Sequence, residues 1–381
     1  MHHYVIKREN MKILYDHQAF SMQDYGGVSR YFTELMNQFY LNKQLLFELS
    51  LRYSNNSNLR NKSFSNHCNF LKGFNFTGKG PLLSQINKLF TIKRIKKTDF
   101  DIFHPTYYDP YFLKYTKKPF VLTIFDMIHE IYPEYFPWYN RIHANKCLLA
   151  ERAEKIIAIS KNTKKDIVKF LKIDPEKIDV IYLGNSISGN IKKNIPEIHE
   201  PLSNSKYLLF VGNRENYKNF RFFVSSILPL FESDKEIRLI CAGGGDFSDE
   251  EKQFIDRFSL QNRVIQVPVN DSLLGELYSH ALTFVFPSLY EGFGIPVLEA
   301  FSRKCPVICS NSSSLPEVGG DAARYFNPEN QDSIMETISR VINDENIRNR
   351  MKEEGLARLN YFSWHKTADD TNDLYSRILN S

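Results

Sequence analysis

The chain has 381 residues, of which 42% are hydrophobic and 24% are charged, so it is long enough for two globular domains. No apolar stretch approaches the roughly 20 residues of a membrane-spanning helix, which argues against an integral membrane protein. The first ten residues are polar, so we expect no signal peptide. Five scattered cysteines without a CxxC pair indicate reduced thiols and a cytoplasmic protein.

The charge is unevenly distributed along the chain. Residues 1–190 carry 28 Lys and Arg against 17 Asp and Glu, whereas residues 191–381 carry 21 against 27. A basic first half predicts contact with something anionic, and a membrane surface, a phosphorylated acceptor and nucleic acid are the candidates.

The first half of the chain alternates short apolar runs with helical patterns, which predicts a doubly wound α/β domain. A strand over Met11–His17 leads through Gly26 and Gly27 into a helix over about 28–40. Ser160 is placed to cap a helix over 161–171. Further strands are predicted at 102–104, 120–125, 155–159 and 178–182.

The second half repeats this alternation. The stretch 186–205 is rich in Ser, Asn, Lys, Glu and Pro and is typical of an interdomain linker. Strands are then predicted at 207–211, 237–242, 264–267, 282–286, 307–310 and 323–326. The pattern indicates two doubly wound domains in tandem.

Two glutamates follow the apolar run 282–286 within the stretch SLYEGFGIPVLEAF. Gly292 and Gly294 allow backbone amides to approach a ligand closely, and Pro296 suits the first turn of a helix. The N-terminus of that helix would attract a diphosphate. Because a carboxylate accepts two hydrogen bonds from a diol, Glu299 suits a ribose and Glu291 a sugar hydroxyl. The alternative is a loop with two solvated glutamates.

Two cations follow the strand 207–211 in the stretch FVGNRENYKNF. Arg214 and Lys218 are placed to neutralise a departing diphosphate. In the first half, Asp126 and His129 follow the strand 120–125 and are candidates for orienting an acceptor hydroxyl, as are His104 and Tyr107. Each of these side chains has an ordinary structural alternative in a solvated loop or a packed core.

The stretch PSLYEGFGIPVLEAF resembles the E-x7-E signature of retaining family 4 glycosyltransferases with the GT-B fold. The likeness covers nearly the whole chain and includes YGGVSRYF, TIFDMIHEIYPEYF, LLFVGNRENYKNF and PEVGGDAARYF. The nearest group is the bacterial O-antigen and polysaccharide mannosyltransferases. The resemblance implies two Rossmann-like domains facing a cleft: an acceptor domain over 1–190, a nucleotide-sugar domain over 191–360, and a helix over 361–381 that returns to the first domain.

The resemblance also assigns residues to roles. Catalytic roles fall on Glu291, Lys218, Arg214, Asp126 and His129. Contacts with the donor fall on Gly26, Gly27, Gly212, Val267, Val269, Gly292, Phe293, Gly294, Ile295 and Glu299. The chain departs from the family pattern at two positions: Asn213 stands where an Arg is common, and Phe125 stands where many relatives carry a His.

We expect a retaining transfer of mannose from GDP-mannose to a lipid-linked saccharide in O-antigen or other surface polysaccharide synthesis. No metal is expected, since the DxD triplet of Asp99 and Asp101 reads as the lead-in to a strand. Other possibilities are a UDP-sugar-dependent transferase of the same fold and a sugar-nucleotide 2-epimerase. A nicotinamide dehydrogenase lacks its GxGxxG fingerprint here, and nucleic-acid binding would leave the two glutamates unexplained.

The stretch LLSQINKLFTIKRIKK is a candidate basic amphipathic helix. Such a helix rests on an anionic membrane, which predicts a cytoplasmic enzyme held peripherally on the inner face of the plasma membrane. The alternative is a surface helix whose charged face is simply solvated.

Overall fold

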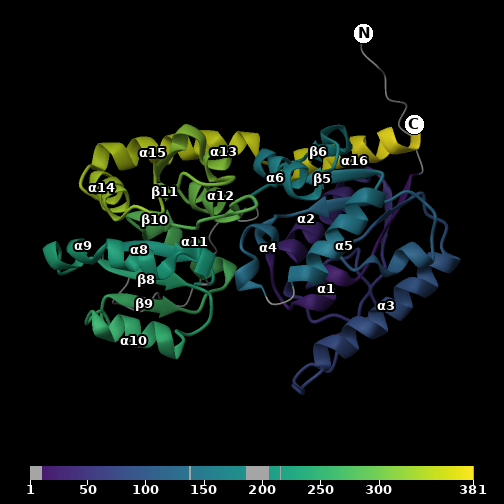
Figure 1. Ribbon diagram of the computed structural model, residues 1–381, viewed down its shortest axis with the longest axis horizontal. Helices are drawn as coiled ribbons and strands as arrows, with labels where there is room; N and C mark the ends of the chain where they lie inside the picture. The colour runs from purple at the N-terminus through teal and green to yellow at the C-terminus, as the bar shows by residue number, and fades with distance from the viewer. Residues whose placement is uncertain (1–10, 137–138, 186–205, 215, 381) are drawn as a thin grey trace, which may run out of the picture. The chain divides into compact units, whose positions relative to one another are not determined.

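The computed structural model describes residues 11–136, 139–185, 206–214 and 216–380 (Figure 1). They divide into two compact units. Unit 1 comprises Met1–Leu183 and Trp364–Ser381, and unit 2 comprises Gly184–Ser363. The linker predicted over 186–205 and the domain limit predicted at residue 190 lie outside the described residues.

Unit 1 is built on parallel strands. Three form a sheet in the order β2-β1-β3, three form a second sheet in the order β4-β5-β6, and a bridge between Phe103 and Phe120 joins β3 to β4. The strand order therefore changes direction between β1 and β3. The strands are β1 Lys12–Tyr15, β2 Leu46–Leu49, β3 Ile102–His104, β4 Val121–Ile124, β5 Lys155–Ala158 and β6 Ile178–Val180.

The helices of unit 1 follow the expected alternation with two differences. First, the short helix α1 separates β1 from the glycine pair Gly26 and Gly27, so the strand does not run directly into that turn. Second, the strand β2, which follows α2, was not predicted. The Ser160 side chain accepts a hydrogen bond from the backbone N–H of Thr163, which confirms the predicted cap of α6. The helices are α1 Gln18–Met22, α2 Gly27–Asn42, α3 Lys79–Lys97, α4 Ile128–Ile131, α5 Tyr139–Arg152 and α6 Lys161–Leu171.

The last helix, α16 (Trp364–Asn380), packs on unit 1. The Tyr375 hydroxyl lies 2.8 Å from the Tyr15 hydroxyl and 2.5 Å from Nδ1 of His104. The Thr123 hydroxyl occupies the other ring nitrogen of His104 at 2.9 Å. His104 is fully buried, and burial lowers its pKa to about 3. The acceptor-binding role considered for His104 is therefore wrong, because one ring nitrogen bonds to Tyr375 of α16 and the other to Thr123 of β4.

Unit 2 contains one parallel sheet with the order β12-β11-β10-β7-β8-β9. Its six strands match those predicted to within one residue at each end. The four inner strands, β7, β8, β10 and β11, are buried runs that are almost entirely apolar, whereas the edge strands β9 and β12 are only partly buried. They are β7 Tyr207–Val211, β8 Arg238–Ala242, β9 Val264–Val267, β10 Thr283–Phe286, β11 Val307–Ser310 and β12 Ala323–Phe326.

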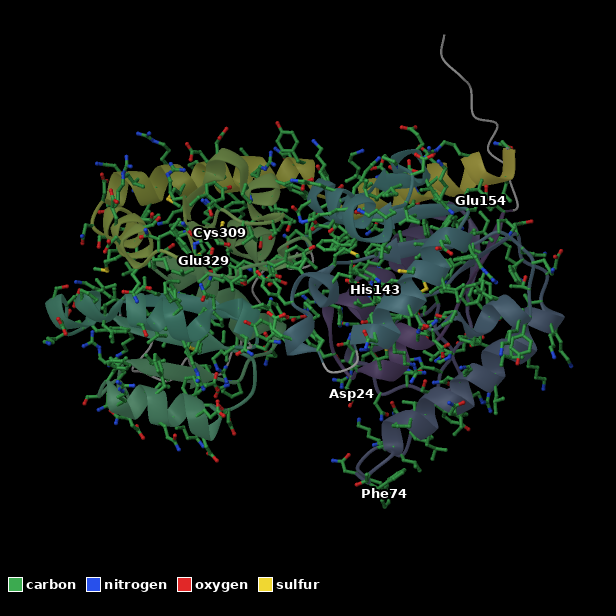
Figure 2. The ribbon with its side chains drawn as sticks, viewed as in Figure 1. Asp24, Phe74, His143, Glu154, Cys309 and Glu329 are labelled. Atoms are coloured by element: carbon green, nitrogen blue, oxygen red, sulfur yellow. The ribbon has the colours of Figure 1, made fainter. Side chains whose placement is uncertain are left out.

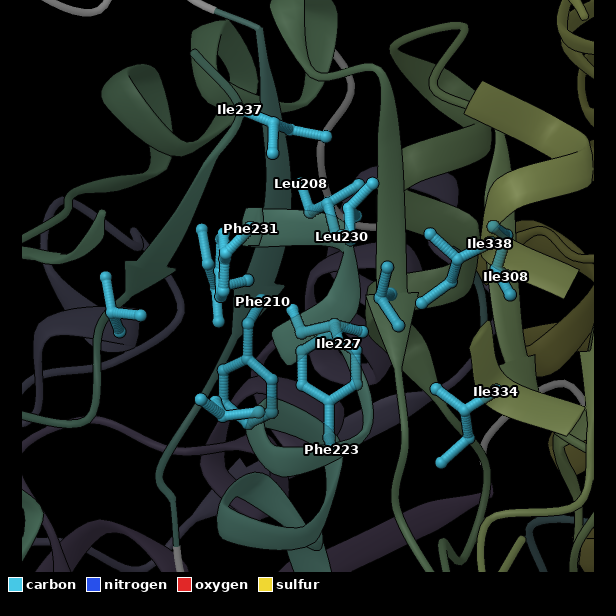
Figure 3. Close-up of a cluster of buried hydrophobic side chains, with 14 of the residues drawn as sticks. Leu208, Phe210, Phe223, Ile227, Leu230, Phe231, Ile237, Ile308, Ile334 and Ile338 are labelled. Atoms are coloured by element: carbon cyan, nitrogen blue, oxygen red, sulfur yellow. The ribbon is translucent and has the colours of Figure 1, made fainter. Parts of the chain in front are cut away.

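The core of unit 2 lies between this sheet and its helices (Figure 3). Leu208 and Phe210 of β7 pack with Phe223 of α8 and with Ile334 and Ile338 of α14. This core fixes the ends of the central strands, from which the site loops emerge. The helices are α8 Phe220–Ser226, α9 Leu228–Ser233, α10 Asp249–Arg257, α11 Asp271–His280, α12 Ile295–Ser302, α13 Leu315–Gly319, α14 Gln331–Ile342 and α15 Glu345–Arg358.

Candidate functional site

The strand order of unit 2 reverses between β7 and β10, since β8 lies on one side of β7 and β10 on the other. In doubly wound sheets, ligands bind beyond the carboxyl ends of the strands at such a point. The loops after β10, β7, β8 and β9 follow neighbouring parallel strands and therefore emerge along one sheet edge. These loops carry most of the residues that the sequence assigned to the donor.

Lys218 and Glu291 meet at the reversal point. The Lys218 ammonium lies 2.6 Å from Glu291 Oε1, and about one-seventh of each side chain is exposed. The backbone N–H of Leu289 donates to the Tyr217 carbonyl at 2.8 Å, which ties the two loops together. The ammonium also lies 5.4 Å from the centre of the Phe286 ring. A cation and a carboxylate are thus held at one point, both still reachable from solvent.

The loop that carries Glu291 is held by serines that sequence reasoning missed. The Glu291 N–H donates to Ser313 Oγ at 2.9 Å. The Ser314 hydroxyl lies within hydrogen-bonding distance of the carbonyls of Glu291 and Phe293, at 2.8 and 2.9 Å. The only signal in the sequence is a run of three serines shortly after β11, the strand beside β10.

Gly294 caps α12 with φ +103°, and a Cβ there would lie 2.7 Å from a Leu315 methyl. Only glycine fits this turn, from which α12 begins. Because α12 begins at Ile295, Glu299 lies at the start of its second turn. Its side chain is 4% exposed, and the Tyr278 hydroxyl donates to it at 3.4 Å.

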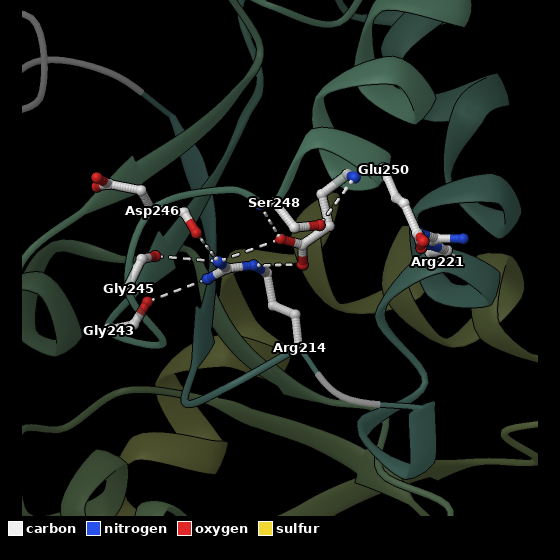
Figure 4. Close-up of polar contacts among 8 residues, drawn as sticks. Arg214, Arg221, Gly243, Gly245, Asp246, Ser248 and Glu250 are labelled. Carbon is white, nitrogen blue, oxygen red and sulfur yellow. Dashed lines mark hydrogen bonds and ion pairs between the residues drawn. The ribbon is translucent and has the colours of Figure 1, made fainter. Parts of the chain in front are cut away.

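Arg214 is held within unit 2 (Figure 4). Its side chain is 3% exposed, and Nε donates to Glu251 at 2.7 Å. The remaining nitrogens donate to the carbonyls of Gly243, Gly245 and Asp246 at 3.0–3.1 Å. These contacts make Arg214 the clamp of the glycine turn after β8. A direct action on the departing diphosphate stays a prediction.

The glycine turn 243–245 lies between two other predicted donor contacts. All three glycines have φ between +72° and +81°. A Cβ on Gly244 would lie 2.6 Å from the carbonyl of Gly212, which itself has φ +117°. On the other side, the Gly243 N–H donates to the Val267 carbonyl at 3.1 Å. Val269 follows that carbonyl by two residues, and a Cβ on Gly243 would lie 3.7 Å from one of its methyl groups.

In unit 1, Asp126 and His129 follow β4. His129 Nδ1 lies 4.0 Å from Asp126 Oδ1, and the imidazole packs on Phe136. Burial lowers the pKa of His129, and the nearby Lys146 ammonium lowers it further. At neutral pH the ring is therefore uncharged and capable of accepting or donating one proton.

A buried lysine beneath this loop was missed by sequence reasoning. Lys146 of α5 is fully buried, and its ammonium donates to the Asp126 carbonyl and to Glu130 Oε2, both at 3.0 Å. His143 Nδ1 lies 3.4 Å from the other oxygen of Glu130. The ion pair fixes the backbone at Asp126. A lysine within a helix gives no sign of this role in the sequence.

The glycine pair of unit 1 lies at the start of α2. Gly26 is the residue that caps the helix, and Gly27 is its first residue. The Asn58 amide donates to the Gly26 carbonyl at 3.3 Å. Arg30, one turn further on, is largely buried, and its guanidinium bonds to the Tyr25 hydroxyl.

Two models of known families match the chain. The model described as Glycosyltransferase Family 4 matches residues 25–187, and the model described as Glycosyl transferases group 1 matches residues 191–358. The chain belongs to these glycosyltransferases.

Relatives and solved structures agree with this assignment. The glycosyltransferase is 29% identical over 367 residues to the O-antigen chain mannosyltransferase B of Escherichia coli, covering 92% of this chain and 96% of that one. It is 30% identical over 221 residues to the O-antigen chain mannosyltransferase RfbU of Salmonella typhimurium, covering 56% and 59%.

The sucrose-phosphate synthase of Thermosynechococcus elongatus superposes with a TM-score of 0.74 at 17% identity, covering 98% of this chain and 100% of that one. Anabaena HepE in complex with UDP and glucose gives 0.74 at 18%, covering 96% and 99%. These neighbours confirm the predicted α/β GT-B fold.

The acidic triplet that might have suggested a metal has other partners. Asp99 is fully exposed and pairs with Lys118, and Asp101 accepts from the Lys12 N–H at 2.9 Å. Among the described residues, no three His, Cys, Asp or Glu side chains gather as metal ligands. Over the same residues, no helix of the glycosyltransferase is long and apolar enough to cross a membrane.

Proposed function

We propose that this glycosyltransferase transfers mannose from GDP-mannose to a lipid-linked saccharide, with retention of the anomeric configuration and without a metal. The observation that carries the proposal is the Lys218–Glu291 pair at the reversal point of the unit 2 sheet. The names of the relatives support the sugar, since two are O-antigen chain mannosyltransferases. One relative, from Campylobacter jejuni, is named for a diphospho-undecaprenol acceptor.

In this proposal the donor binds along the carboxyl edge of the unit 2 sheet. The diphosphate meets the N-terminus of α12 and the Lys218 ammonium. Glu291 accepts a hydrogen bond from a mannose hydroxyl, and Glu299 accepts from the ribose. The backbone of Val267–Val269 lies beside the guanine base. The Arg214 clamp keeps the glycine turn in place beside this binding edge.

The proposed reaction needs no nucleophile from the protein. The bond between mannose C1 and the diphosphate oxygen breaks, and C1 forms a new bond to the acceptor oxygen on the same face. The acceptor's proton passes to the departing diphosphate oxygen. Lys218 and the amides at Gly294 stabilise the charge that develops on the diphosphate, and interactions of this kind lower the barrier because they strengthen in the transition state.

In this proposal, unit 1 supplies the side chains that bind the acceptor substrate. Asp126 and the uncharged His129 orient the attacking hydroxyl, and the Lys146–Glu130 pair holds their loop. The basic surface of unit 1 places the enzyme on an anionic membrane, where a lipid-linked acceptor would lie, and we expect that surface to be the inner face of the plasma membrane. Nucleic acid is not an expected partner.

A donor screen tests the proposal. GDP, UDP, ADP and dTDP, and their sugars, are titrated against the purified chain in EDTA, and the melting temperature is recorded. A ligand that binds the native state raises it. Stabilisation by GDP and GDP-mannose is expected, and the anomeric proton of the product, followed by NMR, is expected to show retention. No shift with any nucleotide would contradict the donor site.

The same screen decides between the proposed donor and its rivals. A shift with UDP alone would overturn the mannose assignment and favour a UDP-sugar-dependent transferase, the alternative that the UDP-bound HepE neighbour supports. Incubation with donor but without acceptor distinguishes the 2-epimerase, since only that enzyme would convert the donor sugar into its C2 epimer.

A further inference from the structure

One segment of unit 1 contains no acidic residue. Between Glu48 and Asp99 the chain runs for 50 residues without an Asp or Glu, and it carries ten Lys and Arg over that length. This acid-free segment, residues 49–98, leads from β2 through α3 to the edge of β3. A long run of one charge sign is an electrostatic feature that a core does not require.

The same segment exposes large apolar side chains. Phe74 is 70% exposed and Leu89 is 66% exposed. Three others, Leu71, Phe76 and Leu82, are between 45% and 46% exposed. Figure 2 shows Phe74 at the outer end of the turn that precedes α3. We name residues 71–76 the apolar tip. Exposed apolar side chains that cluster in one place mark an interaction surface.

The apolar tip is a turn held by hydrogen bonds. The Phe74 N–H donates to the Leu71 carbonyl at 3.1 Å. The Lys79 ammonium then donates to the carbonyls of Leu71 and Phe74, at 3.0 and 2.8 Å. Gly73 and Gly78 supply the positive φ angles, +89° and +93°, that the turn requires. These contacts present the aromatic rings outward.

Helix α3 presents two different sides. Its buried positions recur every four residues, at Leu83, Asn87, Thr91 and Ile95. Two of these four are polar, and they form hydrogen bonds to the backbone of the segment that follows β2. Asn87 Oδ1 accepts from the Tyr53 N–H, and the Thr91 hydroxyl donates to the Ser50 carbonyl. The buried side of α3 is therefore held by hydrogen bonds as well as by apolar contacts. Two leucines of the helix, Leu82 and Leu89, are instead exposed to solvent.

The side of α3 opposite to this buried row is apolar at one end and basic at the other. Positions 82, 89, 93 and 96 fall on one face, because 7, 11 and 14 residues are near-whole numbers of helical turns. Leu82 lies in the first turn of α3 and Leu89 about two turns further on, whereas Lys93 and Lys96 lie in the last turns, and all four side chains are exposed.

We propose that the apolar tip inserts into an anionic lipid bilayer while the exposed face of α3 lies on its surface. Phe74, Phe76 and Leu71 enter the boundary between headgroups and acyl chains, and Lys93, Lys96 and Lys97 contact the lipid phosphates. The inference rests on the proposed function, which places the basic surface of unit 1 on an anionic membrane, and it deepens that proposal by naming the segment that enters the bilayer.

Charge and apolarity together select this occupant. A second copy of the chain that docked symmetrically through this segment would bring the same positive charge and be repelled. Nucleic acid would satisfy the lysines but leave the exposed rings of Phe74 and Phe76 without an apolar environment. An anionic bilayer provides phosphates at its surface and hydrocarbon beneath, in the arrangement that the tip and the basic end of α3 require.

The test is co-sedimentation of the full chain with vesicles, with neither donor nor acceptor present. Vesicles of equal parts phosphatidylcholine and phosphatidylglycerol are expected to bind the chain, and phosphatidylcholine alone to bind it weakly. The double variant Phe74→Ser/Phe76→Ser is expected to bind about a hundredfold more weakly, since burying each ring contributes about tenfold or more. The matched control is Tyr361→Ser, which removes a ring that is 64% exposed in unit 2.

A second variant set separates charge from insertion. Lys93→Gln/Lys96→Gln/Lys97→Gln is expected to weaken binding to anionic vesicles about fivefold for each lysine and to leave binding to neutral vesicles unchanged. In the Phe74→Trp variant, the fluorescence of the added tryptophan is expected to be quenched by lipids brominated on the acyl chain, beyond any quenching seen for the two tryptophans of the wild type. Absence of that quenching would overturn the insertion.

The outcomes separate this inference from the proposed function. Wild-type vesicle binding by the Phe74→Ser/Phe76→Ser variant would overturn the inference even if mannosyl transfer were established. Two other results would also overturn the inference. One is that the wild type forms concentration-dependent dimers that this variant abolishes. The other is that the wild type prefers a DNA duplex to vesicles and that this variant abolishes the DNA binding. The thermal shift of the variant with GDP is expected to equal that of the wild type, so failure of the donor site appears in a different measurement.

Discussion

The two units reverse their strand order in the same way but present different chemistry at the reversal point. In unit 1, between β1 and β3, Asp16 is fully buried. It accepts hydrogen bonds from the Thr106 N–H at 2.8 Å, from the Gln18 amide at 2.7 Å and from the Tyr111 hydroxyl at 3.1 Å. In unit 2, the Lys218–Glu291 pair at the equivalent point is reachable from solvent.

This difference shows that the strand order determines where a site can form, whereas the side chains there determine whether the site binds a ligand or stabilises the fold. Asp16 also accepts from the Thr106 hydroxyl at 2.7 Å, and a carboxylate with three side-chain donors and a backbone N–H around it holds loops together. A carboxylate bonded to a single partly exposed lysine has acceptor capacity left for a ligand. Unit 1 instead keeps its polar candidates for ligand contact after β4, at Asp126 and His129.

The largest effect is expected from the buried carboxylate. Asp16→Ala leaves several buried donors without an acceptor, and we expect it to lower the free energy of unfolding by about 3–5 kcal/mol. Urea denaturation followed by circular dichroism measures this. The control is Asp179→Ala, whose carboxylate forms a surface pair with Arg377, and its expected cost is below about 1 kcal/mol. Equal effects of the two variants would remove the distinction between the two reversal points.

Glu291→Ala should show the opposite profile. We expect the initial rate of mannosyl transfer to fall about a hundredfold or more, since a contact with the reacting sugar and the placement of Lys218 are both lost. The melting temperature should change little, because the pair is partly exposed. Glu250→Ala, which removes an exposed carboxylate paired with Arg221, serves as the control. Full activity of Glu291→Ala would end the proposed role.

The stability of unit 1 should depend on pH through His104. Its pKa is about 3 in the folded protein and about 6.5 when unfolded. Between these values the unfolded chain holds a proton that the folded one lacks, so stability is present above about pH 6.5 and is lost as the pH falls, by about 1.4 kcal/mol per pH unit. Urea titrations from neutral to mildly acidic pH are expected to show a shallower dependence for His104→Gln. An unchanged slope would contradict the burial of an uncharged ring.

Unit 2 provides the contrast for this measurement. Its one histidine among the described residues is His280, whose side chain is half exposed. The pH-dependent loss attributed to His104 should therefore appear in unit 1, where this ring anchors α16. Fluorescence of Trp364, a buried residue of α16, reports on that unit directly.

The smallest effect is expected from Arg214→Lys. A lysine cannot reproduce the fork that joins Glu251 to three carbonyls, so the glycine turn is held less well. We expect KM for the donor to rise about tenfold with little change in kcat. Arg221→Lys is the matched control. A fall in kcat as large as that of a Lys218 variant would instead show that Arg214 acts on the departing diphosphate.

Much of the fold was predictable because parallel strands buried on both faces read as continuous apolar runs. The four inner strands of unit 2 are of this kind. The Ser160 cap was predictable for another reason, since serine is preferred at the residue that caps the start of a helix. Strand β2 was missed because its residues, Leu46–Leu49, are partly exposed and include Glu48, so no apolar run marks them. The helix α1 was missed because five residues are too few for a periodic pattern to appear.

The site was only partly predictable, for a different physical reason. The sequence placed Lys218 and Glu291 beyond strand ends, but their contact depends on β10 lying beside β7. The contacts of Arg214 with the glycine turn 243–245 depend on rotamers and loop paths that spacing does not reveal. A buried lysine such as Lys146 looks solvated in sequence, since only its packing against Glu130 shows otherwise.

The most direct measurement is calorimetric titration of GDP-mannose, in EDTA, into the wild type, Lys218→Gln and the control Arg221→Gln. If the reversal point of unit 2 holds the donor diphosphate, Lys218→Gln should bind at least about tenfold more weakly, because a charge-assisted contact with the diphosphate is lost. The control should bind like the wild type. Equal affinity of all three proteins would contradict the placement of the donor at this point of the sheet.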